Sequence, residues 1–181
     1  MSAGVKTVDI DESLPRDLFP GCRTCVYWES PNQFREKVAP EEAAKLKAAW
    51  FANMGTQPYG KLLYVDDEPA AYCQFAPPDR LPGIFGYEKL SFRLDREAAF
   101  ISCLVVREGY QRRGLGRTLL QETIGDLRRR GYKAVATFAR DNSDNNCSGP
   151  TKFYVEQGFS VVVSESFPDG TFSLVRLDLD S

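Results

Sequence analysis

The sequence contains no histidine, the side chain that enzymes use most often as a general base. Its absence excludes the Ser-His-Asp and Cys-His nucleophile arrangements and most zinc-site chemistries. No apolar run approaches the roughly 18 residues that a membrane span needs. The N-terminus also lacks a basic region followed by an apolar core, so neither a membrane span nor a signal peptide is expected.

A strong excess of one charge is missing as well. The 23 Lys and Arg residues nearly balance the 25 Asp and Glu residues, which gives a net charge of −2. Without a broad basic field the chain is not expected to bind nucleic acid. Its cysteines number 5, which suits a reducing cytoplasm better than a disulfide framework. We therefore expect a cytoplasmic protein with neither a membrane nor a nucleic-acid partner.

Two of the cysteines, Cys22 and Cys25, have the C-x-x-C spacing of redox and zinc sites. Zinc would need two further ligands, which could only be the other cysteines or carboxylates. A redox pair usually begins a helix that follows a strand, whereas this pair follows Pro20 and Gly21. The spacing alone therefore assigns the pair no metal and no redox role.

The length of 181 residues, with 43% of them hydrophobic, is enough for one domain with a substantial core. Residues 1–23 contain Pro15, Pro20 and Gly21 and predict an N-terminal arm. Residues 24–181 predict a single domain, since no internal repeat or low-complexity tract divides them.

Hydrophobic periodicity predicts a mixed α and β organisation. Helices are expected at residues 40–54, 114–130 and 150–157, and strands at residues 24–29, 61–65, 70–75, 98–106, 132–139, 159–164 and 171–178. Residues 77–88 are rich in proline and glycine and predict a loop with little regular structure. The strand–helix–strand unit at the centre predicts an α/β or α+β layer fold.

The junction between the strand ending near Val106 and the helix beginning near Gly114 predicts an anion site. A helix N-terminus offers unpaired N–H groups and a partial positive charge. Gly114 and Gly116 remove side chains that would keep a phosphate away from those amides. The cationic side chains around this point are Arg112, Arg113 and Arg117.

Two common nucleotide motifs do not fit this loop. A dinucleotide fingerprint needs a third glycine where the chain has Leu119. A P-loop needs a Gly-Lys-Ser/Thr ending, which is missing. A lone G-x-G is often only the start of a surface helix, but here the strand-loop-helix context and the clustered arginines favour a phosphate loop.

Two ordered motifs resemble those of one known family. The run Leu104-Val105-Val106, a turn through Gly109-Tyr110 and then Gln111-x-x-Gly114-x-Gly116 is similar to the acyl-CoA-binding motif of the GNAT N-acetyltransferases. Further along, Phe153-Tyr154-Val155-Glu156-Gln157-Gly158-Phe159 is similar to the family's FYxxxGF signature. The resemblance is strong from residue 98 to residue 159, and the order of elements fits from residue 24 to residue 178.

The resemblance implies the GNAT acyl-CoA N-acyltransferase fold, a mixed central sheet flanked by helices. It also implies an N-acetyltransferase that takes acetyl-CoA as co-substrate, uses no metal, and passes the acetyl group to a primary amine by direct attack. The acceptor is not identified, and a homodimer is compatible with the family. A non-catalytic acyl-CoA-binding sensor or interaction module is the alternative, and a longer acyl chain stays open.

The resemblance assigns the cofactor mostly to backbone groups. The amides of residues 112–117 would hold the pyrophosphate, and the backbone of Leu104 and Val106 would pair with the pantetheine arm. An amide of this strand would also polarise the thioester carbonyl. The cofactor-binding residues implied in this way are Leu104, Val105, Val106, Gln111, Arg112, Arg113, Gly114, Leu115, Gly116, Arg117 and Asn146.

Tyr154 is the implied catalytic residue, because a phenol within hydrogen-bond reach can protonate or stabilise the departing CoA thiolate. The alternative is a tyrosine that only packs on a short helix. No general base is assigned: the strand positions where many family members carry a glutamate hold Ser102 and Cys103. The other candidates are Glu29, Tyr87 and Glu88.

The family's pantetheine-binding asparagine, counted from Tyr154, falls on Cys147, so its role passes to Asn146, with Asn142 and Asn145 nearby. Cys147 would lie beside the thioester and could take the acyl group first, although no base is evident near it. The acceptor groove is expected between residues 40–55 and 77–92. Its aromatic lining would come from Trp28, Trp50, Tyr59 and Phe85.

Overall fold

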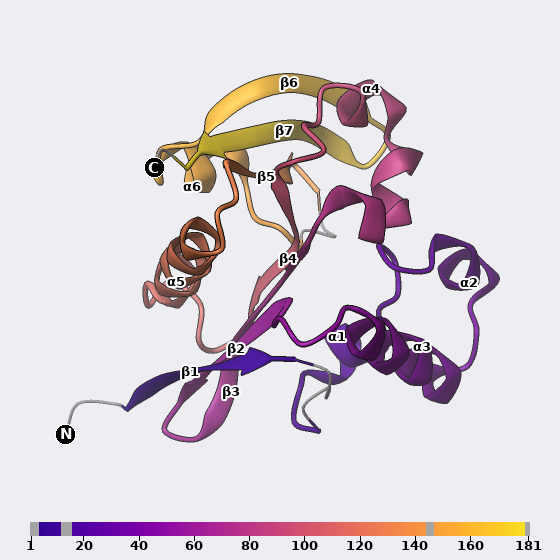
Figure 1. The fold of residues 1–181 in the computed structure, drawn as a ribbon, viewed down its shortest axis with the longest axis vertical. Helices are drawn as coiled ribbons and strands as arrows, with labels where there is room; N and C mark the ends of the chain where they lie inside the picture. The colour runs from indigo at the N-terminus through magenta and orange to yellow at the C-terminus, as the bar shows by residue number, and fades with distance from the viewer. Residues whose placement is uncertain (1–3, 12–15, 144–146, 180–181) are drawn as a thin grey trace.

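The structure, a computed structural model, describes residues 4–11, 16–143 and 147–179. These residues form a 7-stranded sheet in the order β1-β2-β3-β4-β5-β7-β6 (Figure 1). The strands are β1 Val5–Ile10, β2 Gly60–Val65, β3 Glu68–Ala76, β4 Ala99–Val106, β5 Ala134–Asp141, β6 Ser160–Phe167 and β7 Gly170–Asp178. Neighbouring strands are antiparallel except β4 and β5, which are parallel. The predicted mixed sheet is confirmed.

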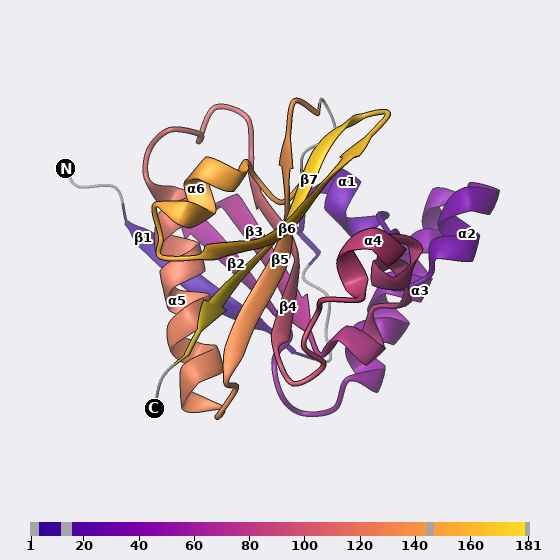
Figure 2. The ribbon, with the colours of Figure 1, turned by 90° about the horizontal axis from the view of Figure 1, so that it is seen from above.

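The helices lie in two layers, one on each face of the sheet (Figures 1 and 2). One face carries α5 Leu115–Arg129 and α6 Thr151–Val155. The other carries α1 Pro20–Arg23, α2 Pro31–Glu36, α3 Pro40–Asn53, α4 Glu88–Ser91 and the 3-10 turns Pro78–Arg80 and Pro82–Gly86. Each layer has its own hydrophobic core against the sheet.

The three predicted helices and six of the predicted strands are confirmed within a few residues. The prediction of a strand at 24–29 is wrong. This segment forms turns instead, and it buries the side chains of Val26 and Trp28 without pairing with the sheet. Residues 77–88 are more regular than predicted, because prolines begin both 3-10 turns with a suitable φ. Strand β1 was not predicted, since its pairing partner β2 lies far away in sequence.

The parallel strands β4 and β5 separate soon after they begin. Their backbone register holds only at Ala99↔Val135 and Phe100↔Ala136. Beyond that point residues 147–149 lie between them: the amide of Leu104 donates to the carbonyl of Cys147 at 2.8 Å, and the amide of Arg140 donates to that of Gly149 at 3.0 Å. The sheet is therefore split between the C-terminal halves of β4 and β5, on the side where β4 leads into α5.

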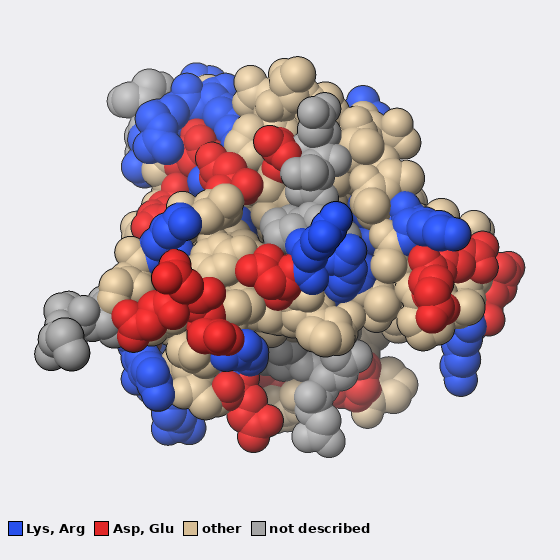
Figure 3. Space-filling view, turned by 90° about the horizontal axis from the view of Figure 1, so that it is seen from below, with Lys and Arg blue, Asp and Glu red and all other residues tan. Residues whose placement is uncertain are grey.

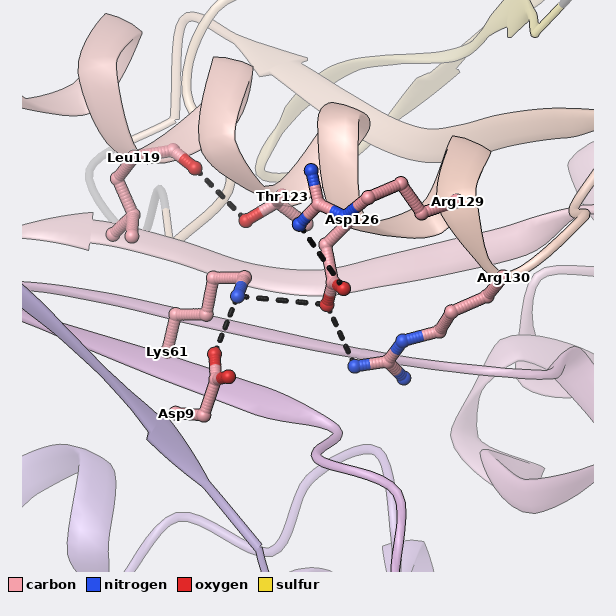
Figure 4. Close-up of polar contacts among 7 residues, drawn as sticks. All are labelled: Asp9, Lys61, Leu119, Thr123, Asp126, Arg129 and Arg130. Atoms are coloured by element: carbon pink, nitrogen blue, oxygen red, sulfur yellow. Dashed lines mark hydrogen bonds and ion pairs between the residues drawn. The ribbon is translucent and has the colours of Figure 1, made fainter.

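An ion-pair network fixes α5 to the sheet on this side (Figure 4). Lys61 of β2 lies between Asp9 of β1, to which it donates a hydrogen bond, and Asp126 of α5, at 3.5 Å. Asp126 also accepts a hydrogen bond from Arg130 at 2.6 Å, and Arg129 lies 3.5 Å from it. The Lys61 side chain is only 7% exposed, so water screens this network less than a surface pair. The network orients the helix whose N-terminus carries the glycine loop.

One face of the molecule carries mixed charge. On the face drawn in Figure 3, acidic and basic side chains are interspersed rather than separated by sign. This agrees with the net charge of −2. Among the residues described, no helix is both long and apolar enough to cross a membrane.

Candidate active site

A groove of about 620 Å³ lies where β4 ends and α5 begins, beside α6. It is lined by Leu104, Val105, Val106, Gln111, Arg112, Gly114, Leu115, Gly116, Arg117, Gly149, Pro150 and Phe153. The structure thus brings together nearly all of the predicted cofactor-binding residues. Arg113 does not line the groove, and Asn146 lies outside the described residues.

The glycine loop has the backbone conformation of an open helix start. Gly114 precedes α5 with φ of 80°, a left-handed value that glycine adopts without strain. Arg112 is also left-handed, with φ of 60°. The amide of Thr118 donates to the carbonyl of Gly114 at 3.0 Å. The amides that precede it in the first turn have no partner within the helix, so they are available to an anion.

The arginines of the loop are exposed and carry no counter-charge. Among the described residues, no carboxylate forms a salt bridge with Arg112, Arg113 or Arg117. Arg112 and Arg117 line the groove. Arg113 instead stacks on the ring of Tyr110, with its guanidinium carbon 5.2 Å from the ring centre. The groove therefore has a cationic end that suits phosphate groups.

Gly116 lets the first turn of α5 approach the end of β4. A Cβ at this position would lie 3.3 Å from Cγ2 of Val106 and 3.9 Å from Cζ of Phe153. Both neighbours line the groove. A larger residue here would therefore push into the groove or move its walls.

We expect Gly116→Val to weaken acetyl-CoA binding at least tenfold, about 1.4 kcal/mol, because the branched side chain occupies the groove. Gly125→Val on the same helix is the matched control, since its Cβ meets only the flexible end of Arg129, at 3.5 Å. Both substitutions carry a similar helix-propensity change. Calorimetric titration of the two variants measures the difference, and equal affinities would contradict the assignment of the groove.

The backbone at the end of β4 is already engaged. The amide of Leu104, which the resemblance assigns to the pantetheine or the thioester, donates to the carbonyl of Cys147. The carbonyl of Val106 accepts a hydrogen bond from Nε2 of Gln111 at 3.2 Å. A ligand that pairs with this strand as an added strand must replace these contacts or use the remaining groups.

Tyr154 lies on α6, is fully buried and does not line the groove. Its ring lies directly behind the groove wall, because a Cβ at Gly149 would be 3.8 Å from ring atoms of both Phe153 and Tyr154. Its hydroxyl donates a hydrogen bond to the carbonyl of Ser148. Burial raises the pKa of Tyr154 well above its usual value. The phenol is therefore held protonated, as a hydrogen-bond donor.

The three candidate bases are not brought together. Glu29 is 7% exposed and pairs with Lys47, and its Oε1 also accepts a hydrogen bond from Nε2 of Gln74 at 2.7 Å. Tyr87 lines a cavity of about 440 Å³, and burial raises its pKa. Glu88 lines a different cavity, of about 390 Å³. None of the three lines the groove at the end of β4.

Two neighbouring cavities lie on the other face of the sheet, and both are lined by Tyr27 and Phe34. The cavity of about 440 Å³ is otherwise lined by Pro31, Arg35, Pro82, Gly83, Gly86, Tyr87 and Phe167. The second, of about 300 Å³, adds Gly21, Thr24, Cys25, Arg140 and Cys147. Cys147 belongs to this cavity and, through its carbonyl, contacts the amide of Leu104. It therefore connects the second cavity to the groove.

The predicted aromatic lining is dispersed. Trp28 is 2% exposed in the core, and Nε1 of Trp50 donates to the carbonyl of Arg80 at 2.9 Å. Tyr59 packs against both hydrophobic cores. Phe85 lines the cavity of about 390 Å³ that Glu88 also lines.

Sequence reasoning missed Gly149, Pro150 and Phe153 in the groove. In the second cavity it missed Tyr27, Phe34 and Arg140, among others. Tyr27 directly precedes Trp28, and the sequence does not show which of two adjacent aromatic side chains lines a cavity and which is buried in the core. Arg140 is the next-to-last residue of β5, a largely apolar strand, and the sequence gives no sign there of a lining role.

Cys147 has an unusual electrostatic setting. A hydrogen bond with the thiol of Cys103 and the positive charges of Arg140 and Lys47 lower its pKa to about 6, although burial opposes them. The same hydrogen bond and burial raise the pKa of Cys103 well above its usual value. These interactions favour the thiolate form of Cys147 over that of Cys103.

The described residues contain no group of three or more cysteine or carboxylate side chains placed to hold a metal ion. The C-x-x-C pair is reduced, and burial raises the pKa of Cys22 to about 11 and that of Cys25 in the same direction.

Comparisons with known proteins agree with the site and the fold. A sequence profile of the acetyltransferase (GNAT) family matches residues 23–159. An N-acetyltransferase from Staphylococcus aureus Mu50 has a TM-score of 0.62 at 14% identity, with 98% of this chain and 99% of that chain covered. No curated protein matches the chain by sequence.

Two similar structures were solved with a CoA species. The PaiA N-acetyltransferase from Thermoplasma acidophilum, in complex with coenzyme A, has a TM-score of 0.56 at 13% identity, with 97% of this chain and 99% of that chain covered. The yncA protein of Salmonella typhimurium, with its cofactor acetyl-CoA, has a TM-score of 0.59 at 18% identity, with 97% of this chain and 94% of that chain covered. At these identities the likeness confirms the predicted fold.

Proposed function

This chain belongs to the GNAT acetyltransferase family, and we propose that it transfers the acetyl group of acetyl-CoA to a primary amine by direct attack of the amine on the thioester. Family membership implies acetyltransferase activity, and the acceptor is not identified. The groove at the end of β4 carries the proposal. It joins the separated ends of β4 and β5 to a glycine-rich helix start. Two arginines, Arg112 and Arg117, line it, and neither has a salt bridge within the part of the chain that the structure describes.

Each part of the groove suits one part of acetyl-CoA. The amides of the first turn of α5, with Arg112 and Arg117, would hold the pyrophosphate. The split between β4 and β5 leaves strand backbone that an extended pantetheine arm could pair with. The amide of Leu104 would then polarise the thioester carbonyl, in place of its contact with Cys147.

Tyr154 would act as the acid when the tetrahedral intermediate collapses. Its phenol is held as a donor, and its ring lies directly behind Gly149 in the groove wall. Its hydroxyl is bound to the carbonyl of Ser148, the residue that follows Cys147. The acceptor amine would approach from the cavity that Cys147 and Arg140 line.

The domain division belongs to the same proposal: residues 24–181 form the acetyltransferase domain, and residues 1–23 form an arm. The arm contributes β1, which pairs with β2 at the sheet edge distant from β6 and β7.

The alternative function is a non-catalytic acyl-CoA-binding module. One observation favours it: among the described residues that line the groove there is no carboxylate. Transfer of acetyl to a panel of amines, lost in Tyr154→Phe, distinguishes an enzyme from a binding module.

The first test is a set of thermal melts with saturating acetyl-CoA, CoA and NAD. Ligand at a hundred times its dissociation constant adds about 2.7 kcal/mol to the free energy of unfolding. For a domain of this size we expect a rise of about 5–10 °C in the midpoint with acetyl-CoA and CoA, and little change with NAD. If neither CoA species moves the midpoint, the glycine loop is only a helix start and the proposal fails.

A further inference from the structure

Four of the five cysteines gather on the face of the sheet opposite α5. Cys25 and Cys147 line the same cavity of about 300 Å³. Cys103 is buried in β4, and the next residue, Leu104, is hydrogen-bonded to the backbone of Cys147. Cys22 packs against the same hydrophobic core as Cys103. All of them are reduced in the structure. Such a cluster, between a cavity and the cofactor groove, is unexplained by acetyl transfer.

Cys103 and Cys147 are placed like neighbours on paired strands. The amide of Leu104, the residue after Cys103, donates to the carbonyl of Cys147 at 2.8 Å. Each thiol also acts on the pKa of the other, as expected of side chains that lie side by side. Backbones held together in this way bring Cα atoms to the separation of roughly 4.4–6.8 Å that a disulfide spans. A bond between the two sulfurs therefore needs little movement of the chain.

The two thiols are unequal in a way that suits oxidation. Cys147 is partly exposed, opens on the cavity and is activated by the charges of Arg140 and Lys47. Cys103 is 5% exposed and is held as a thiol. Cys147 is therefore the sulfur that a small oxidant can reach, and Cys103 is the sulfur that can react with it next.

We propose that Cys147 and Cys103 form a hydroperoxide-sensitive pair whose disulfide closes the cofactor groove. The Cys147 thiolate attacks the peroxide, the O–O bond breaks, and a sulfenic acid forms with release of water or an alcohol. The Cys103 thiol then attacks the sulfenic sulfur, so an S–S bond forms and the S–O bond breaks with loss of water. The two thiols supply both electrons, and a dithiol reductant reverses the change.

The disulfide acts on the groove through the Leu104 amide. This amide is the group assigned to the pantetheine or the thioester, and in the structure the Cys147 carbonyl occupies it. A disulfide would hold residues 147–149 against β4 and keep that amide from a ligand. This effect on cofactor binding, the second part of the proposal, rests on the proposed function, whereas the formation of the disulfide does not.

The C-x-x-C pair is the competing site of oxidation. Burial raises the pKa of Cys22 to about 11 and also raises that of Cys25, so few of these thiols ionise at neutral pH. Thiolates react with peroxide and thiols do not, so we expect both to react more slowly than Cys147.

The experiment treats the reduced full-length protein with hydrogen peroxide and maps disulfides by mass spectrometry of peptides. We expect the peptides of Cys103 and Cys147 to be joined, and a dithiol to release them. Cys25→Ser, the matched control in the same cavity, should form the same disulfide. Cys103→Ser should form none, and its Cys147 should instead be trapped as a sulfenic acid by a cyclic 1,3-diketone.

A disulfide between Cys22 and Cys25, or thiols at Cys103 and Cys147 that stay reduced while others oxidise, would overturn the pair. Acetyl-CoA melts then test the second part. Oxidised protein should lose the stabilisation by acetyl-CoA, corresponding to at least tenfold weaker binding, and recover it with the dithiol. An unchanged shift in protein with the mapped disulfide would overturn the switch. A reduced protein without any shift refutes the proposed function instead, while the disulfide map still decides the pair.

Discussion

Replacing Lys47 with methionine is expected to lower the free energy of unfolding by about 3–5 kcal/mol. Lys47 lies on α3 with 1% of its surface exposed. Its ammonium group donates to the carboxylate of Glu29 and, at 2.9 Å, to the carbonyl of Cys25. Methionine fills a similar volume without charge, so Glu29 is left as a buried carboxylate without its counter-charge. In a chain of this size the melting midpoint should fall by roughly 6–20 °C.

Neutral pH is suitable for this measurement. Burial is the largest single effect and lowers the pKa of Lys47, but the attraction and hydrogen bond of Glu29, with smaller contributions from Cys103 and Cys25, together outweigh it, and the net pKa shift is upward. A lysine with a raised folded-state pKa contributes its full stabilisation below its unfolded pKa of about 10.5. The contribution is lost only as the pH rises through the folded-state pKa. A melt near neutral pH therefore includes the whole contribution.

Two further variants separate the lost charge from a general effect of mutation. Lys45→Met changes an exposed lysine on the same helix and should alter stability by no more than about 0.5 kcal/mol. The double variant Lys47→Met with Glu29→Gln removes both charges, and its amide can still contact Gln74. We expect the double variant to recover more than half of the loss, and no recovery would contradict the ion-pair explanation.

The fold was most predictable where each element carries its own local signal. Pro40 begins α3 and Gly55 follows its end, both as the sequence indicated. The hairpin of β2 and β3 turns at Asp66 and Asp67, and both adopt left-handed backbone conformations that aspartate tolerates. Strand β1 gave no such signal, because its stability comes from pairing with β2 across a long stretch of chain. Non-local pairing of this kind is not encoded in a local pattern.

The candidate site was predictable in its backbone part only. Glycines and arginines next to each other in sequence indicated the phosphate loop, and the structure places most of them around one groove. The cavity beside Cys147 could not be predicted, because Tyr27, Arg140 and Cys147 come from three separate segments. The contact of Cys103 with Cys147 depends on how far β4 and β5 separate, which no residue pattern specifies. The lowered pKa of Cys147 follows from this tertiary contact.

Replacing Tyr154 with phenylalanine is expected to lower kcat by about 10²–10⁴-fold, while the KM for acetyl-CoA changes little. The substitution removes the phenol that would protonate the departing CoA thiolate, and it leaves the ring behind Gly149 in place. Steady-state rates with an amine acceptor measure kcat, and melts with acetyl-CoA measure whether binding persists. Because burial raises the pKa of Tyr154, the wild-type enzyme should show no alkaline loss of rate from this group.

A structural role for Tyr154 would give a different result. The phenylalanine variant also loses the hydrogen bond to the Ser148 carbonyl, which costs about 1–3 kcal/mol of stability when an acceptor is left buried. Rates are therefore expressed per folded molecule. Tyr132→Phe is the matched control, because Tyr132 is a half-buried tyrosine packed against the same core, away from the groove. If both variants keep the same kcat, Tyr154 only packs on α6, and the acid must be sought elsewhere along the groove.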